Sequence, residues 1–201
     1  MRKDELIASV QKLILKQGVT QDSMKSVHPK VIEGEIAGAY NTMLKAFYQN
    51  DANLMNAELD FYAKKYTAGV QKDSDGFFYV DIPVKVLELK DNLGFRSITP
   101  KGGQYQFVRT KENSLARIRK LPVYCCLKDA YYYKDGNRIV LDFPVAEYSL
   151  VEQVYVKVLP LFSEFEDADN IEFPQGDSIA KNTILQLMGF RPTDNINDDV
   201  R

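Results

Sequence analysis

The spacing of apolar residues changes near Gly76, and this change limits the folds that the chain can adopt. Before Gly76, apolar residues recur every three or four positions, which is the period of amphipathic helices. After it they alternate with polar residues, the period of half-buried strands, until helical spacing returns in residues 177–188. Helices, then strands, then one helix predict an α+β fold with a mostly antiparallel sheet, because a parallel sheet needs strands and helices in alternation.

The helical part is expected to cover residues 1–70. Residues 5–17 predict a first helix. A second is expected behind Pro29, a residue that suits the first helical turn, and it carries the widest apolar stripe of the chain. The spacing in residues 54–62 indicates a third helix that ends before Gly69.

The β-rich part is expected at residues 76–162. Its clearest feature is a hairpin over residues 131–141, because Asp135-Gly136 readily adopts the positive φ values of a tight turn. Alternation predicts a strand at 78–86, lying at a sheet edge or bulged, because Pro83 cannot donate a backbone hydrogen bond. Two further strands are expected at residues 105–108 and 154–159, with a break in regular structure between residues 94 and 103.

The C-terminal part, residues 177–201, is expected to form a helix and a polar tail. The end of an acidic stretch, at Asp177, can cap this helix. The whole chain, residues 1–201, is expected to be a single domain. The residues expected on the apolar face of the helix are Ile179, Ala180, Thr183, Ile184, Leu187 and Met188.

The residue types that most often carry catalysis are scarce. The chain has one histidine, His28, which stands directly before Pro29 and is expected to serve at the start of a helix. Cys125 and Cys126 are neighbours, and they are expected to be inert thiols in an apolar strand, because a bridge between adjacent residues is strained. No glycine-rich phosphate motif occurs. We therefore expect a protein that is not an enzyme, with no catalytic residue, cofactor or metal site.

Neither a signal peptide nor a membrane helix is expected. The first residues lack an uninterrupted apolar core, and nowhere do about 18 apolar residues run together. Two reduced cysteines fit synthesis in a reducing cytoplasm.

Charge is balanced over the whole chain but not within it. The formal net charge is −2, yet residues 96–120 carry seven Lys or Arg against one Glu, and residues 161–177 carry six acids and no base. The candidate interface or DNA-facing residues in these two segments are Arg109, Lys111, Arg117, Arg119, Lys120, Glu164, Glu166, Asp167 and Asp169.

Several interpretations of the charged segments stay open. Each segment can be an ordinary solvated surface. The basic one, with Tyr105 and Phe107 interleaved for stacking on bases, can bind nucleic acid. The acidic one can hold a divalent cation or supply an acid and a base, although the calcium-loop spacing is missing. Finally, the basic segment of one copy can meet the acidic segment of the next, and such a head-to-tail contact forms a ring when its rotation closes.

The tyrosines of the hairpin suit the last of these interpretations. Tyr131, Tyr132 and Tyr133 alternate between the two faces of a strand, so at least one ring is expected to project away from the core. Tyrosine is common at protein interfaces, and it is equally common on an ordinary sheet face.

As a whole, the chain resembles small neck and tail structural proteins of tailed bacteriophages, specifically the ring proteins of crAss-like phages. The resemblance lies in the helices at residues 5–13 and 31–40, the strand Phe78-Tyr79-Val80-Asp81-Ile82-Pro83 and the ending at residues 190–199.

This resemblance implies a virion structural protein of the head-tail connector. Identical copies, twelve in the family, form a closed ring around the channel through which the genome leaves. Partners would be the portal and other neck or tail proteins, with transient DNA contact, and assembly would take place in the host cytoplasm. No catalytic residue or cofactor comes with the family. The alternative function is a nucleic-acid-binding module that uses the basic segment 96–120.

Overall fold

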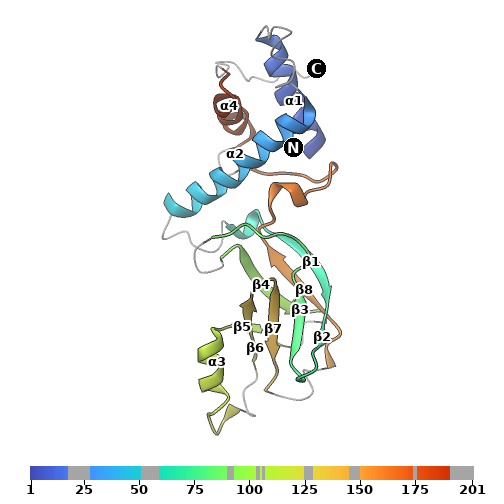
Figure 1. Cartoon of the computed structure of the whole chain (residues 1–201), viewed down its shortest axis with the longest axis vertical. Helices are drawn as coiled ribbons and strands as arrows, with labels where there is room; N and C mark the ends of the chain where they lie inside the picture. Colours follow the sequence, from blue (N-terminus) through green and yellow to red (C-terminus); the bar gives the residue numbers. More distant parts are fainter. Residues whose placement is uncertain are drawn as a thin grey trace. The chain divides into compact units, whose positions relative to one another are not determined.

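The computed structural model describes most of the chain and confirms the α+β fold (Figure 1). It contains helices at both ends of the sequence and antiparallel and mixed sheets between them. The described residues are 1–17, 28–50, 59–89, 93–102, 105, 107–124, 129–144, 150–173 and 176–190.

The chain forms two compact units that do not follow simple chain order. One unit, here called the helical unit, combines Met1–Tyr62 with Pro160–Arg201. The other, here called the β unit, is Ala63–Leu159. The β unit is therefore an insertion into the helical unit, because the chain returns to the first unit at Pro160.

The helical unit is built around the apolar faces of three α-helices, α1 (Lys3–Lys16), α2 (Pro29–Asn50) and α4 (Asp177–Leu187). A short 3-10 turn, η6 (Phe162–Glu164), completes its core. The ring of Tyr40 lies at its centre and contacts three phenylalanine rings at centroid distances of 5.6 to 5.7 Å, in edge-on or tilted geometry. These phenylalanines are Phe162, Phe165 and Phe173.

Two sheets make up the β unit. The smaller is antiparallel, with the order β1 (Lys64–Gly69), β8 (Gln153–Val158) and β4 (Phe95–Pro100). The larger has the order β2 (Gln71–Lys72), β3 (Phe78–Asp81), β7 (Arg138–Asp142), β6 (Ala130–Asp135) and β5 (Phe107–Arg109). Among the strands that the structure describes, only β5 and β6 pair in parallel. One apolar cluster contains buried side chains from both sheets, among them Val80, Phe95, Ile139 and Val156.

The chain enters and leaves the β unit through neighbouring strands. β1 is its first strand and β8 its last, and they pair with Lys64 opposite Val158. Their alternation explains the pairing, because Val154, Val156 and Val158 are fully buried on one face of β8.

The predicted hairpin is confirmed, with its turn one residue later than expected. Asp135 of β6 lies opposite Arg138 of β7, so the turn residues are Gly136 and Asn137. Gly136 has a φ of 55°, in the left-handed region that a two-residue hairpin turn requires.

Several details of the predicted elements are wrong. Residues 64–68, expected at the end of a third helix, belong to β1 (Lys64–Gly69), and residues 59–61 form a 3-10 turn, η2 (Leu59–Phe61). Residues 54–58 of the expected helix lie outside the described residues. The strand expected at 78–86 ends at Asp81 and lies between β2 and β7, so it is not an edge. β4 occupies the region where a break was expected.

The C-terminal helix is confirmed, but its buried face matches the expected one only at Ala180 and Ile184. Its N-cap is Gly176, so Asp177 is the first helical residue. The buried residues are Ala180, Lys181, Ile184 and Leu185, whereas Ile179 and Leu187 are 50% and 56% exposed.

Candidate interaction surface

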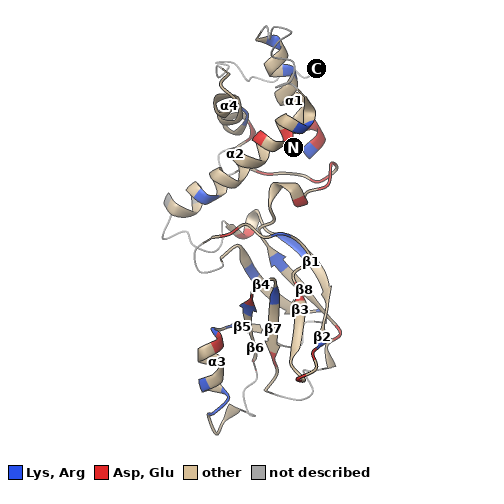
Figure 2. Ribbon diagram, viewed as in Figure 1, with Lys and Arg blue, Asp and Glu red and all other residues tan. Residues whose placement is uncertain are grey.

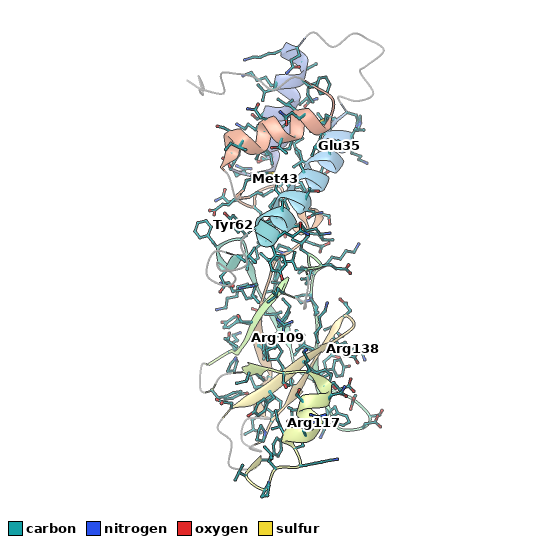
Figure 3. All side chains as sticks on the ribbon, turned by 90° about the vertical axis from the view of Figure 1, so that its left-hand side faces the viewer. Glu35, Met43, Tyr62, Arg109, Arg117 and Arg138 are labelled. Carbon is teal, nitrogen blue, oxygen red and sulfur yellow. The ribbon has the colours of Figure 1, made fainter. Side chains whose placement is uncertain are left out.

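The basic residues follow one another along β5, a short helix and the turn after it (Figure 2). The helix, α3 (Glu112–Ile118), is held to the rest of the β unit by Leu115, which is its one buried residue. Arg109, Lys111, Arg117 and Lys120 are exposed. Arg117 therefore lies on an outward face of α3, at the end of the β unit away from the start of β1 (Figure 3).

The residues after α3 form a closed turn, which we call the α3 tip and define as residues 119–124. The amide of Tyr124 donates to the carbonyl oxygen of Leu121 at 3.0 Å, so residues 121–124 form a β-turn. Pro122 occupies its second position, where the φ of proline is already suitable. Leu121 and Val123 beside it are 50% and 57% exposed.

Both ends of the α3 tip bind the same carboxylate. Arg119 donates from Nε and Nη2 to Oδ1 of Asp142 at 3.0 and 2.6 Å, and the hydroxyl of Tyr124 donates to Oδ2. Asp142 is the last residue of β7 and is 8% exposed. The guanidinium of Arg119 also lies 5.3 Å from the ring centre of Phe77. This cluster fixes the turn to the larger sheet.

The cluster raises the pKa of both Tyr124 and Arg119. Burial, together with the hydrogen bond to Asp142 and its charge, raises the pKa of Tyr124 well above 10.0. Burial lowers the pKa of Arg119, but the hydrogen bonds and the charge of Asp142 outweigh it and the net direction is upward. Arg119 therefore stays cationic and Tyr124 stays neutral at neutral pH.

An open groove lies between the start of α3 and β6. Its volume is ≈ 880 Å³. One wall comes from Arg109, Thr110, Lys111, Glu112 and Ser114, and the other from Tyr133, Lys134 and Asp135. Three cations and two carboxylates therefore share the lining, which is nearly balanced in charge and suits a polar protein surface better than a polyanion.

The prediction that Tyr105 and Phe107 stack on nucleic-acid bases is wrong. Phe107 is 9% exposed and belongs to the apolar core of the β unit. Tyr105 packs against it at a centroid distance of 5.4 Å and also against Phe143. Side chains alternate along β5, so Phe107 points inward while Val108 and Arg109 are exposed.

The hairpin tyrosines alternate as expected. Tyr132 is buried, while Tyr131 and Tyr133 are half-buried on the other face of β6. Burial, followed by the charges of Glu112 and Asp135, raises the pKa of Tyr133.

The acidic residues belong to the helical unit, where backbone hydrogen bonds hold their segment to the N-terminus. The amides of Lys3 and Asp4 donate to the carbonyl oxygens of Asp169 and Asp167 at 3.1 and 3.2 Å. Glu166 and Asp167 are exposed, whereas Glu164 and Asp169 are half-buried. Glu164 is the last residue of η6 and the other three acids follow it, and Oδ2 of Asp169 accepts a hydrogen bond from the amide of Glu166. The two candidate charged segments thus lie in different units.

His28 occupies the start of α2, as expected. Its carbonyl oxygen accepts from the amides of Val31 and Ile32, and its Nδ1 accepts from the amide of Lys30 at 3.3 Å. Cys125 and Cys126 lie outside the described residues. Within the described ranges, no three His, Cys, Asp or Glu side chains come together in a way that could hold a metal ion.

Sequence reasoning missed Asp142, Tyr124 and Phe77. A signal existed for the first, since Asp142 ends the apolar run Ile139-Val140-Leu141 and a carboxylate there must be paired if the strand is buried. Nothing in the sequence identified its partners, because Arg119 is 23 residues away.

Comparisons with known proteins do not assign a function to this surface. No protein-family model matches the chain, and a search of curated proteins gives no match. Among the described helices, none is both long and apolar enough to cross a membrane.

Proposed function

We propose that this chain is a non-enzymatic virion structural protein that forms an oligomeric ring in the neck or tail connector of a tailed bacteriophage. The observation that carries the proposal is the separation of charge between the two units. The β unit presents exposed Arg117 and Lys120 on and beside α3, and the helical unit presents exposed Glu166 and Asp167. The resemblance to ring proteins of crAss-like phages supports the same role.

A single chain that has one charged patch on each of two units suits head-to-tail contact. The basic patch of one copy can meet the acidic patch of the next, and repetition closes a ring when the rotation between copies allows it. Exposed ion pairs contribute only about 0–1 kcal/mol each, so charge selects the orientation while apolar contacts supply most of the affinity. In this role the ring, a dodecamer by the resemblance, surrounds the DNA channel and binds the portal and neighbouring tail proteins.

Electron microscopy and native mass spectrometry of the full chain, alone and with its portal, test this proposal. We expect a closed ring of identical copies. The double reversal Arg117→Glu/Lys120→Glu should weaken ring formation, and the compensating variant Glu166→Lys/Asp167→Lys in the neighbouring copy should restore it. A chain that stays monomeric alone and never joins a neck assembly would show that the proposal is wrong.

A nucleic-acid-binding module is the second candidate, favoured by the exposed cations Arg109, Lys111, Arg117 and Lys120. It predicts DNA affinity that falls steeply with salt and that weakens when these residues become alanine. The burial of Phe107 and the packing of Tyr105 remove the stacking platform that this role would use. Absence of DNA binding at low salt would eliminate it.

A further inference from the structure

The α3 tip presents two apolar side chains to solvent on a turn that is already closed. Leu121 and Val123 are both at least half exposed, and the hydrogen bond from Tyr124 to Leu121 fixes the backbone between them. Because Arg119 and Tyr124 both bind Asp142, the turn is tied to β7 at each end. A group held in this way loses little conformational freedom on binding, which lowers the entropic cost of an interface.

Cations surround this apolar apex. Arg117 precedes the tip by two residues and Lys120 lies within it, and both are exposed. Neither has an ion-pair partner among the described residues. The tip therefore combines an apolar centre with a positive rim, which is the arrangement of a protein interface with a central apolar contact and a polar periphery.

The outer face of α4 has the complementary character. Ile179, Thr183 and Leu187 are spaced by four residues and so lie on one side of the helix. Ile179 and Leu187 are half exposed. Between them, the hydroxyl of Thr183 donates a hydrogen bond to the carbonyl oxygen of Ile179 at 2.9 Å. This face therefore presents two apolar side chains to solvent, and the hydroxyl between them is bound within the helix.

The segment that leads into α4 is acidic. Lys181 is the one base in residues 160–190, and it is only 8% exposed on the buried side of the helix. Glu166, Asp167 and Glu172 are exposed before the helix, whereas Asp177 in its first turn is half-buried and lies 3.9 Å from the N-terminal ammonium of Met1. The α4 face thus follows an acidic segment, opposite in charge to the border of the α3 tip.

On these grounds, and resting on the proposed ring, we infer that the α3 tip of one copy binds the outer face of α4 in the next copy. Leu121 and Val123 contact Ile179 and Leu187. Arg117 and Lys120 face the exposed acids before α4, which are Glu166, Asp167 and Glu172. Both surfaces occur once on every copy, so the contact is heterologous and repeats around a ring. Interfaces of this kind bury about 800 Å² per partner, so the tip supplies the centre of a larger contact.

Two measurements on the full chain test this assignment. The first is ring formation by Leu121→Glu/Val123→Glu, with Leu150→Glu as a matched control because Leu150 is also in the β unit and is 80% exposed. All these side chains are exposed, and a thermal melt verifies that each variant folds. The second replaces Leu121 with the photocrosslinking residue benzoylphenylalanine and maps the crosslinked peptides by mass spectrometry.

We expect the double variant to lose the ring, the Leu150→Glu variant to retain it, and the crosslinks to join residue 121 to residues 177–187 of another copy. A ring that forms as well with Leu121→Glu/Val123→Glu, or crosslinks that map elsewhere, would overturn this inference and leave the proposed ring intact. A wild-type chain that forms no ring alone or with its portal would overturn both.

Discussion

Asp142 and Arg119 lie 23 residues apart in the chain, and two nitrogens of the arginine bind one carboxylate oxygen of the aspartate. The aspartate is 8% exposed, while the arginine side chain keeps about a third of its exposure. The pair therefore lies at the border between the sheet and solvent. At this position the loss of one partner leaves the other charge only partly hydrated.

The variant Asp142→Asn should destabilise the β unit. It removes the acceptor charge and leaves the Arg119 guanidinium without compensation, for which we expect a loss of about 1–3 kcal/mol, below the range for fully buried pairs because Arg119 is partly solvated. Asp81→Asn is the matched control, since the Asp81–Arg138 pair is exposed on both sides and should contribute about 0–1 kcal/mol. Urea denaturation measures both, and equal losses would show that Asp142 is no more than a surface charge.

Alkaline pH should release the α3 tip through Tyr124. Its pKa is raised in the folded state, because burial and Asp142 favour the neutral hydroxyl. The stabilisation is therefore complete below the unfolded pKa of 10.0 and is lost as the pH rises through the higher folded value. Tyr124→Phe should be less stable than wild type at neutral pH, by about 1–2 kcal/mol, and should lose less stability on going above pH 10.0. Identical pH slopes for the two proteins in chemical denaturation would contradict this.

Replacing Gly94 by alanine should destabilise the β unit where the chain leaves it. A Cβ at this position would overlap the carbonyl oxygen of Leu87. The site cannot easily relax, because Leu159 donates to Gly94 at 2.7 Å and accepts from Leu87 at 2.8 Å. We expect a loss of about 1–3 kcal/mol, the usual range for overpacking. Gly69→Ala is the control, since no atom lies within 4 Å of its added Cβ, and a thermal melt that shifts equally for both would refute the explanation.

The β unit should fold when residues 63–159 are produced alone. It has its own apolar core, and its first and last strands pair directly, with Lys64 opposite Val158. Residues paired in this way have Cα atoms about 5 Å apart, so a short linker can replace the unit in the remaining chain. Circular dichroism and cooperative melting of the excised unit measure this outcome. An unfolded fragment would mean that the core of the β unit depends on the helical unit.

The elements that the sequence predicted well are those with a strong and local pattern. The first two helices carry wide apolar stripes, and the hairpin needs only two adjacent strands and a glycine turn. β1 was missed because its burial pattern has no fully buried residue, and β4 because Pro100 and the neighbouring Gly94 suggested a break. β4 is nevertheless a strand, since it pairs with β8, more than 50 residues further along the chain.

Of the candidate surface, the sequence predicted only the charged residues. Basic residues near α3 were identified from composition, and the aromatic residues between them were assigned the wrong side of a strand, because position alone does not say which face is buried until the partner sheet is known. The exposed apolar residues of the α3 tip and of the outer face of α4 could not be predicted either. Their exposure depends on which side of each element the rest of its unit covers.

The pairing of β1 with β8 also determines how the β unit bears a mechanical load. When a neighbouring protein pulls on the β unit, the force passes through the two chain segments that connect this unit to the rest of the chain. These segments lie side by side at Lys64 and Val158. Covalent backbone then carries the force, and the hydrogen bonds between the two strands need not break.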